Sequence, residues 1–298
     1  MERLSGGQSM QWYDGNLLID RQPALDERPL DNAALRFGAS VFTTMRVYEQ
    51  QLDDVRSQYP AHCDRLTHSL QAFDWQQPDW PSIYRGAQQL ALHYPVIRIT
   101  LFPDGTEWIT GRALPPQLES QQRNGIACWL APATYARSLP AHKTGNYLAC
   151  WLARQQAQKQ GAQEAILTNF QGDWLETATG NLWGWADGQW WTPTGEGLEN
   201  KNCSEPESQP ESQRKYKDRC LPGLMRKKVR RVLEENGLAV NGQLWDQSIV
   251  SRFEAIAYTN CVVEVVPIHT ILSDRTTLEY NAHHASLKAL RQWLASSS

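Results

Sequence analysis

The stretch between residues 143 and 192 constrains the fold of this 298-residue chain more than any other. It begins with a lysine and continues through a helical pattern from Asn146 to Gln160, which Gly161 ends. Four short strand-like segments follow: Glu164 to Thr168, Trp174 to Glu176, Asn181 to Trp185 and Gln189 to Thr192. Their connections contain Gly172 and Asp187-Gly188, which predicts a β-meander directly after the helix.

The part of the chain before residue 117 has the pattern of a smaller α+β domain. The expected elements are a hairpin over Gln11 to Ile19, strands over Ser40 to Tyr48 and Val96 to Leu101, and a helix over His62 to Phe73. A polar stretch with two prolines, Leu114 to Gly125, is the candidate linker. We therefore expect a two-domain α/β (α+β) fold, with a smaller N-terminal domain over 1–116 and a larger C-terminal domain over 117–298.

One segment of the larger domain differs in composition from the rest. Glu199 to Arg219 is polar, contains Pro206 and Pro210 and has no hydrophobic period, so it predicts a mobile insertion at about 199–219. The other expected elements are a strand over Ile126 to Leu130, a basic helix over Leu224 to Asn236, a strand and turn over Ala255 to Val266, and a final helix over Leu287 to Leu294.

Charge and cysteine content exclude several classes of function. The net charge of −3 requires neither nucleic acid nor an anionic membrane as a partner. We find no signal-peptide core and no apolar run of about 18 residues, so a soluble, cytoplasmic protein is expected. The six cysteines are scattered without a CxxC pair, which argues against metal sites and disulfide frameworks.

Lys143 and Glu176, which lies 33 residues later, carry the strongest functional signal. Lys143 precedes the predicted helix, whose positive end, together with burial, would favour the nucleophilic free amine. Glu176 could keep a pyridine nitrogen protonated. An amine that forms a Schiff base and such an acid are what pyridoxal 5'-phosphate (PLP) requires of a protein. The ordinary alternatives are a solvated lysine and a strand carboxylate facing water.

A PLP phosphate also needs hydrogen-bond donors. Arg65 could bind it through two N–H groups. The Pro222-Gly223 turn precedes a helix, so the backbone amides of Leu224 and Met225 would face an anion. Asn260 and Cys261 belong to a second small polar turn. Each signal is weak alone, and Arg65 by itself is typical of a surface helix.

The order of these motifs resembles that of the class IV aminotransferases, the fold-type IV PLP enzymes. The resemblance runs from about Trp12 to Ile268, apart from the 199–219 segment. It rests on Arg36 to Arg46, His62-x-x-Arg65-Leu66, Lys143-x-x-Asn146-Tyr147, Glu176-x-x-x-x-Asn181-Leu182, Gly223 to Arg226, and Asn260 to Pro267. It implies a fold like that of D-amino-acid aminotransferase, PLP as cofactor, a small-molecule substrate and a homodimer.

The resemblance also implies roles for the matching positions. Lys143 would hold the cofactor covalently and move protons, and Glu176 would bind its pyridine nitrogen. The phosphate would be held by Arg65, the amides of Leu224 and Met225, and the turn of Asn260 and Cys261, with Tyr147 near the cofactor. Arg98 and Arg46 are candidates for binding substrate carboxylates, although both also suit structural roles.

The residues after Phe42 point to one branch of this family. Phe42-Thr43-Thr44 is similar to the aminodeoxychorismate lyases, in which a threonine at the Thr44 position is thought to help the catalytic lysine. Against this, Phe102 to Trp108 replaces the Arg-Gly-rich stretch that many of these lyases carry. We expect a lyase that forms 4-aminobenzoate and pyruvate for folate biosynthesis. The alternatives are a branched-chain or D-amino-acid aminotransferase, and a non-catalytic PLP-fold binding protein.

Overall fold

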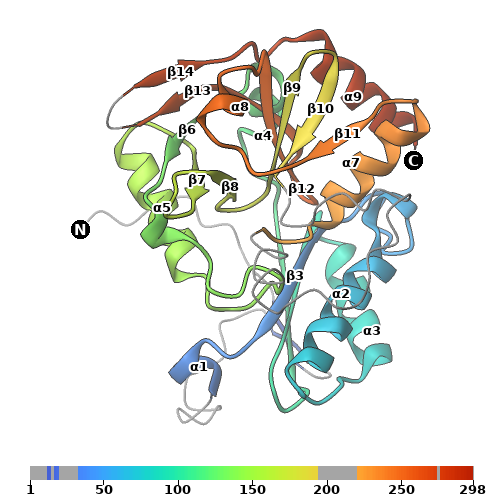
Figure 1. Cartoon of the computed structure of the whole chain (residues 1–298). Coiled ribbons are helices and arrows are strands. Elements are labelled where there is room, and N and C mark those ends of the chain that lie inside the picture. Colours follow the sequence, from blue (N-terminus) through green and yellow to red (C-terminus); the bar gives the residue numbers. More distant parts are fainter. Residues whose placement is uncertain (1–11, 15–16, 20–32, 194–219, 274–275, 298) are drawn as a thin grey trace, which may run out of the picture. The chain divides into compact units, whose positions relative to one another are not determined.

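The computed structural model in Figure 1 describes residues 12–14, 17–19, 33–193, 220–273 and 276–297. The chain divides into two compact units, Met1–Pro116 with His142–Asn146, and Gln117–Ala141 with Tyr147–Ser298. Residues 142–146 thus fall in the first unit, although the sequence suggested the second, because their backbone pairs with a strand of the first sheet. The insertion expected at 199–219 lies outside the described residues.

The first unit is built on a five-stranded antiparallel sheet with the order β2-β1-β5-β4-β3. Its strands are β1 (Trp12–Asp14), β2 (Leu17–Ile19), β3 (Val41–Arg46), β4 (Val96–Leu101) and β5 (Glu107–Arg112), and its helices α1 (Ala33–Phe37), α2 (Tyr59–Ala72) and α3 (Trp80–Ala91). The β-branched residues of β3 and β4 favour strands. Met45, Leu66, Ile83 and Ile97 form part of the core between the sheet and helices α2 and α3. The predicted hairpin, two strands and α2 are confirmed, whereas β5 and α3 were not anticipated.

The second unit holds a nine-stranded mixed sheet with the order β11-β10-β9-β12-β13-β6-β7-β8, and β14 pairs with β13. The strands are β6 (Ile126–Leu130), β7 (Glu164–Thr168), β8 (Trp174–Thr177), β9 (Asn181–Ala186), β10 (Gln189–Thr192), β11 (Val240–Gly242), β12 (Ala255–Asn260), β13 (Glu264–Leu272) and β14 (Thr277–Glu279). The helices are α4 (Leu118–Asn124), α5 (Leu148–Lys159), α7 (Leu224–Glu235), α8 (Gln247–Val250) and α9 (Ala285–Ser296). The predicted mixed α/β class is confirmed.

The expected β-meander over 164–192 is wrong. The strands exist, but β8 pairs with β7, whereas β9 pairs with β10 and β12. The reason is the turn between β8 and β9, in which the Thr177 backbone N–H donates to the Gly180 carbonyl at 2.8 Å. A Cβ on Gly180 would lie 2.5 Å from the Thr259 carbonyl oxygen, so this turn lies directly against the end of β12.

The stretch proposed as a linker is only partly one. Helix α4 occupies its second half, with Leu118 buried and the Gln122 side chain donating to the Val263 carbonyl at 2.9 Å. Gly125 ends the helix with a φ of +82°. One apolar anchor is too little to give a helical hydrophobic period, which is why the pattern did not reveal α4.

Tryptophan forms much of the core of the second unit. Trp183 and Trp190 are fully buried, with ring centroids 6.2 Å apart in an edge-to-face arrangement. They pack with Met225 and Val229 of α7 and Leu290 of α9. This packing fixes where α7 begins relative to β9 and β12, which matters for the site below.

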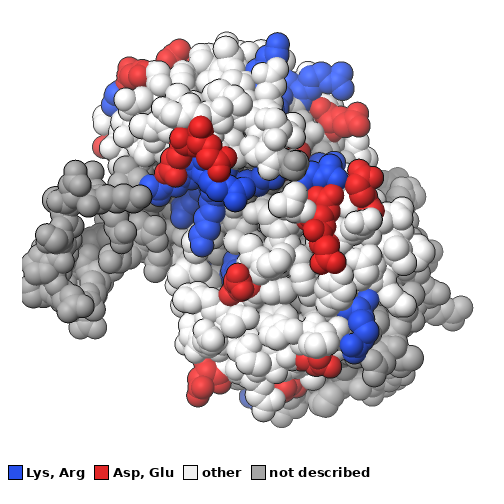
Figure 2. All heavy atoms as spheres, turned by 90° about the vertical axis from the view of Figure 1, so that its right-hand side faces the viewer, with Lys and Arg blue, Asp and Glu red and all other residues white. Residues whose placement is uncertain are grey.

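The surface carries charges of both signs. In Figure 2, Lys and Arg atoms lie beside Asp and Glu atoms on the face it shows. On α7, Arg230 pairs with Glu234 at 2.8 Å and Arg231 with Glu235 at 3.6 Å. Among the described residues, no helix is both long and apolar enough to cross a membrane.

Candidate active site

The Lys143 segment lies along the start of β3. The Phe42 N–H donates to the Lys143 carbonyl at 2.8 Å, and the Gly145 N–H donates to the Ser40 carbonyl at 2.6 Å. A Cβ on Gly145 would lie 2.1 Å from the Ser40 hydroxyl and 3.1 Å from the Gly38 carbonyl oxygen, so a larger residue there would displace its neighbours. The helix expected from Asn146 begins at Leu148, so Lys143 lies outside its first turn and the dipole argument for the amine does not apply.

The Lys143 amine instead lies over an aromatic ring. Its Nζ is 4.8 Å from the centroid of the Phe42 ring, and the guanidinium carbon of Arg98 is 3.7 Å from the same centroid. Arg98 pairs across the strands with Thr44, and alternation along β3 places Thr44 on the same face as Phe42. The structure therefore gathers Lys143, Arg98 and Thr44 around Phe42.

Arg46 is not part of this group. It lies two residues beyond Thr44 on β3, a rise of about 6.6 Å, and its guanidinium carbon is 4.9 Å from the ring centroid of Tyr48. Arg56 lies over that ring too, at 4.5 Å. This stacking supports the structural role that the sequence left open for Arg46.

Arg65 lies on α2 and reaches back to β3. Its Nη2 donates to the Thr43 hydroxyl, which also lies 2.5 Å from His62 Nδ1. Burial holds the pKa of His62 well below its usual range, and the charges of Arg65 and Lys143 lower it further. One turn along α2, Ser69 Oγ is 3.0 Å from Nδ1 of His142, the residue before Lys143.

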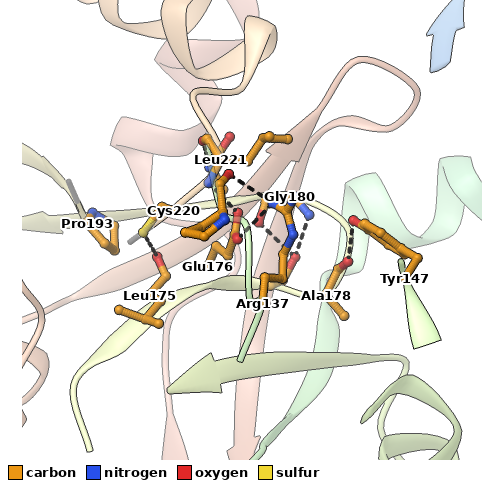
Figure 3. Close-up of polar contacts among 12 residues, drawn as sticks. Arg137, Tyr147, Leu175, Glu176, Ala178, Gly180, Pro193, Cys220 and Leu221 are labelled. Carbon is orange, nitrogen blue, oxygen red and sulfur yellow. Dashed lines mark hydrogen bonds and ion pairs between the residues drawn. The ribbon is translucent and has the colours of Figure 1, made fainter. Parts of the chain in front are cut away.

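Glu176 is buried on β8 in the second unit, with both carboxylate oxygens bound (Figure 3). Oε1 lies 3.3 Å from Arg137 Nη1, and Oε2 accepts the Leu221 N–H at 3.1 Å. Burial opposes the charge of Arg137, but the carboxylate outweighs it, so the pKa of Arg137 is raised. Arg137 was missed by the sequence analysis because no motif surrounds it.

Leu221 connects Glu176 to the start of α7. Its carbonyl accepts from the Asn181 side chain at 2.9 Å, while its N–H binds Glu176. A Cβ on Gly223 would lie 2.0 Å from Asn181 Oδ1, which explains the glycine. Tyr147, also shown in Figure 3, donates to the Ala178 carbonyl at 2.9 Å, and burial raises the pKa of its hydroxyl, so it remains a donor.

The two turns expected to bind phosphate differ. Leu224 and Met225 open the twelve-residue helix α7, and its N-cap Gly223 offers no side-chain acceptor to their amides. Asn260, by contrast, uses Oδ1 to accept the N–H groups of Val262 and Val263, and its Nδ2 donates to the Thr179 carbonyl at 3.2 Å. Asn260 therefore shapes its turn, and Cys261 is half-buried against the tryptophan cluster.

These residues fit PLP. Glu176 is a buried carboxylate with a paired cation, which suits a pyridinium nitrogen, and the uncapped start of α7 suits a phosphate. The amine for the aldehyde would come from Lys143. Within the described ranges, no three His, Cys, Asp or Glu residues are grouped as a metal would require.

Comparison with known proteins gives a consistent result. The family model of amino-transferase class IV matches residues 40–271. The branched-chain-amino-acid aminotransferase of Escherichia coli (strain K12) is 21% identical over 266 residues, covering 80% of this chain and 78% of the relative.

Solved structures agree in fold. The PLP-bound form of a hypothetical aminotransferase from Mycobacterium tuberculosis has a TM-score of 0.72 at 17% identity, with 97% of this chain and 98% of that chain covered. A Legionella pneumophila protein proposed to be a 4-amino-4-deoxychorismate lyase has a TM-score of 0.71 at 16% identity, with 93% and 96% covered. The chain belongs to the class IV aminotransferase family, whose members are enzymes that use pyridoxal 5'-phosphate.

Proposed function

We propose that the protein is an aminodeoxychorismate lyase, which converts 4-amino-4-deoxychorismate to 4-aminobenzoate and pyruvate. The observation that carries this proposal is the placement of Thr44. Its side chain lies on the Phe42 face of β3, where Lys143 and Arg98 also lie. A hydroxyl on the same face of the strand as the amine suits a reaction in which that amine must both accept and return a proton.

The residues divide the work as follows. When bound, PLP supplies an electron sink. Lys143 would hold the cofactor covalently and would remove the proton from the substrate carbon that bears nitrogen. The enolpyruvyl group leaves as pyruvate, and the substrate ring becomes aromatic. Thr44 would hydrogen-bond the lysine or the leaving group, and Arg98 would bind a substrate carboxylate.

The remaining residues hold the cofactor. Glu176, whose carboxylate oxygens lie against Arg137 and the Leu221 N–H, would accept a hydrogen bond from the protonated pyridine nitrogen. Arg65 and the amides of Leu224 and Met225 would bind the phosphate. Tyr147, fixed on the Ala178 carbonyl, would line the cofactor site.

A product assay tests the proposal. The PLP-loaded protein receives enzymatically generated aminodeoxychorismate, and 4-aminobenzoate and pyruvate are followed together. A lyase forms both in equal amounts. Formation of neither by protein that carries the lysine-bound cofactor would reject the lyase.

An aminotransferase is the second candidate, because the branched-chain relative covers most of the chain. The discriminating measurement is transfer of an amino group to 2-oxoglutarate from a panel of branched-chain and D-amino acids. Production of glutamate without 4-aminobenzoate would replace the first proposal with this one.

We also propose a homodimer. Leu148, Trp151 and Leu152 are 61%, 54% and 39% exposed on α5, and their i, i+3, i+4 spacing makes one apolar surface on the helix. Exposed apolar surfaces of this kind mark protein interfaces. A second copy of the chain would cover it. Trp151→Glu should shift the protein from dimer to monomer in light scattering, and a wild type that is monomeric would contradict the proposal.

A further inference from the structure

The Thr43 hydroxyl joins two side chains of α2 inside the first unit. Thr43 and His62 are both fully buried. Arg65 Nη2 donates to Thr43 Oγ1, and the same oxygen is 2.5 Å from His62 Nδ1. All three groups belong to one compact unit, so their contacts follow from the packing of α2 on β3.

The direction of each hydrogen bond follows from the donors. A guanidinium can only donate, so Thr43 Oγ1 accepts from Arg65 and directs its own proton to His62 Nδ1. Arg65 Nη2 also lies 3.5 Å from Nδ1, which again favours an unprotonated Nδ1. Because burial and nearby cations lower the pKa of His62, the ring stays neutral and keeps this acceptor.

This arrangement restrains Arg65. A free arginine side chain samples many rotamers, but a bond from Nη2 to a buried hydroxyl fixes the plane of the guanidinium. Phosphate binding by arginine depends on that plane, because two parallel N–H groups must meet two oxygens. The threonine and histidine thus act on the phosphate only through Arg65.

We propose that Thr43 and His62 are positioning residues that orient Arg65 toward the phosphate of PLP, so that the protein prefers PLP over pyridoxal. The inference rests on the phosphate-binding role proposed for Arg65. It does not depend on whether the enzyme is a lyase or an aminotransferase.

The test compares the affinity of the apoprotein for PLP and for pyridoxal, which lacks the phosphate. Thr43→Val has the same shape but no hydroxyl, and Thr43→Ser restores it. We expect Thr43→Val to weaken PLP binding about tenfold and to leave pyridoxal binding unchanged, with Thr43→Ser close to wild type. Equal losses for both ligands, or none for PLP, would overturn the inference.

Two further variants keep the test decisive. His62→Asn retains an acceptor near the place of Nδ1, whereas His62→Leu does not, so only the latter should lose the preference for PLP. If His62→Asn and His62→Leu show the same preference for PLP, the proposed role of His62 is rejected. This comparison remains decisive even if Thr43→Val fails to fold. Arg65→Met tests the phosphate-binding role of Arg65 separately. An unchanged ratio of PLP to pyridoxal affinity in this variant would reject that role.

Discussion

The Lys143 segment and the Glu176 strand are held in opposite ways. Lys143 is held through its backbone: its carbonyl accepts from Phe42 of β3, and the Gly145 N–H donates to the Ser40 carbonyl just before β3. Its half-buried side chain lies over the Phe42 ring. Glu176 lies within a hydrogen-bonded pair of strands, and its carboxylate is bound at both oxygens by Arg137 and Leu221. The backbone contacts thus hold the Lys143 segment, whereas Glu176 is also held through both oxygens of its side chain.

This difference suits the role proposed for each group. A lysine that exchanges a covalent partner and moves a proton needs freedom at Nζ. A carboxylate that stabilises charge on a ring works best when it is oriented in advance, so that nothing reorganises during the reaction. The contrast leads to tests in which each region is disturbed separately.

Lys143→Ala tests the Lys143 segment. We expect turnover to fall by at least about 10³-fold, because the variant loses both the nucleophile and the general base. The visible absorbance of the lysine-bound cofactor should vanish while the thermal unfolding of the apoprotein changes little. Lys159→Ala, at the exposed end of α5, is the control. Near wild-type turnover in Lys143→Ala would end the assignment of this residue.

Arg137→Met tests the Glu176 strand. Both side chains of the Arg137–Glu176 pair are buried, at 7% and 5% exposure, so removal of one partner leaves a charge uncompensated. The free energy of unfolding should fall by about 3 kcal/mol. Arg231→Met breaks an exposed pair with Glu235 and should cost under about 0.5 kcal/mol. Similar losses in urea unfolding of the two variants would show that the buried pair has no special weight.

The sequence predicted the motif residues of the candidate site better than the residues that support them. Lys143, Glu176, Arg65 and the start of α7 belong to recurrent motifs, so the sequence could single them out. Arg137 could not be predicted, because its role arises from the fold of a loop onto β8. The sequence also could not show that the Asn260 side chain closes its own turn, because that contact depends on the distant Thr179 carbonyl. The phosphate role of the turn of Asn260 and Cys261 stays a prediction.

Prediction of the fold from the sequence had the same limit, because local elements were found but their distant contacts were not. Strands such as β4, β6 and β7 are rich in apolar residues and were located to the residue. Their pairing was not, because strand order is decided by contacts between distant segments. Strand β12 lies between β9 and β13, far along the chain from the hairpin of β9 and β10. The meander was therefore a reasonable local prediction that a distant strand overturned.

Glu164→Gln tests a residue that supports the turn after Glu176, through the pH dependence of the free energy of unfolding. Glu164 is buried and accepts from Thr179, in the turn after Glu176. Burial raises the pKa of Glu164, although Arg154 and Thr179 oppose the shift. The folded state thus holds this proton more tightly than the unfolded state. Above about pH 4.3, wild type should lose up to about 1.4 kcal/mol of stability per pH unit relative to the variant, until the raised pKa is passed.

The measurement is the free energy of unfolding of both proteins from pH 4 upward. The control is Glu279→Gln, which removes an exposed carboxylate on β14 and no buried contact. A flat difference between Glu164→Gln and wild type would show that the Glu164 carboxyl group titrates alike in the folded and unfolded chains.

Ser69→Ala removes a side-chain hydrogen bond to the Lys143 segment and should have the smallest effect of these variants. The buried Ser69 hydroxyl bonds His142 Nδ1, so its loss should cost about 1 kcal/mol of stability. If this side-chain tether helps to hold the segment, the Phe42 amide, which donates to the Lys143 carbonyl, should exchange with solvent faster in the variant. Ser251→Ala, whose exposed hydroxyl bonds the Ser248 carbonyl, provides the control. Unchanged exchange at Phe42 would mean that the bonds to β3 alone hold Lys143, which would sharpen the contrast with Glu176.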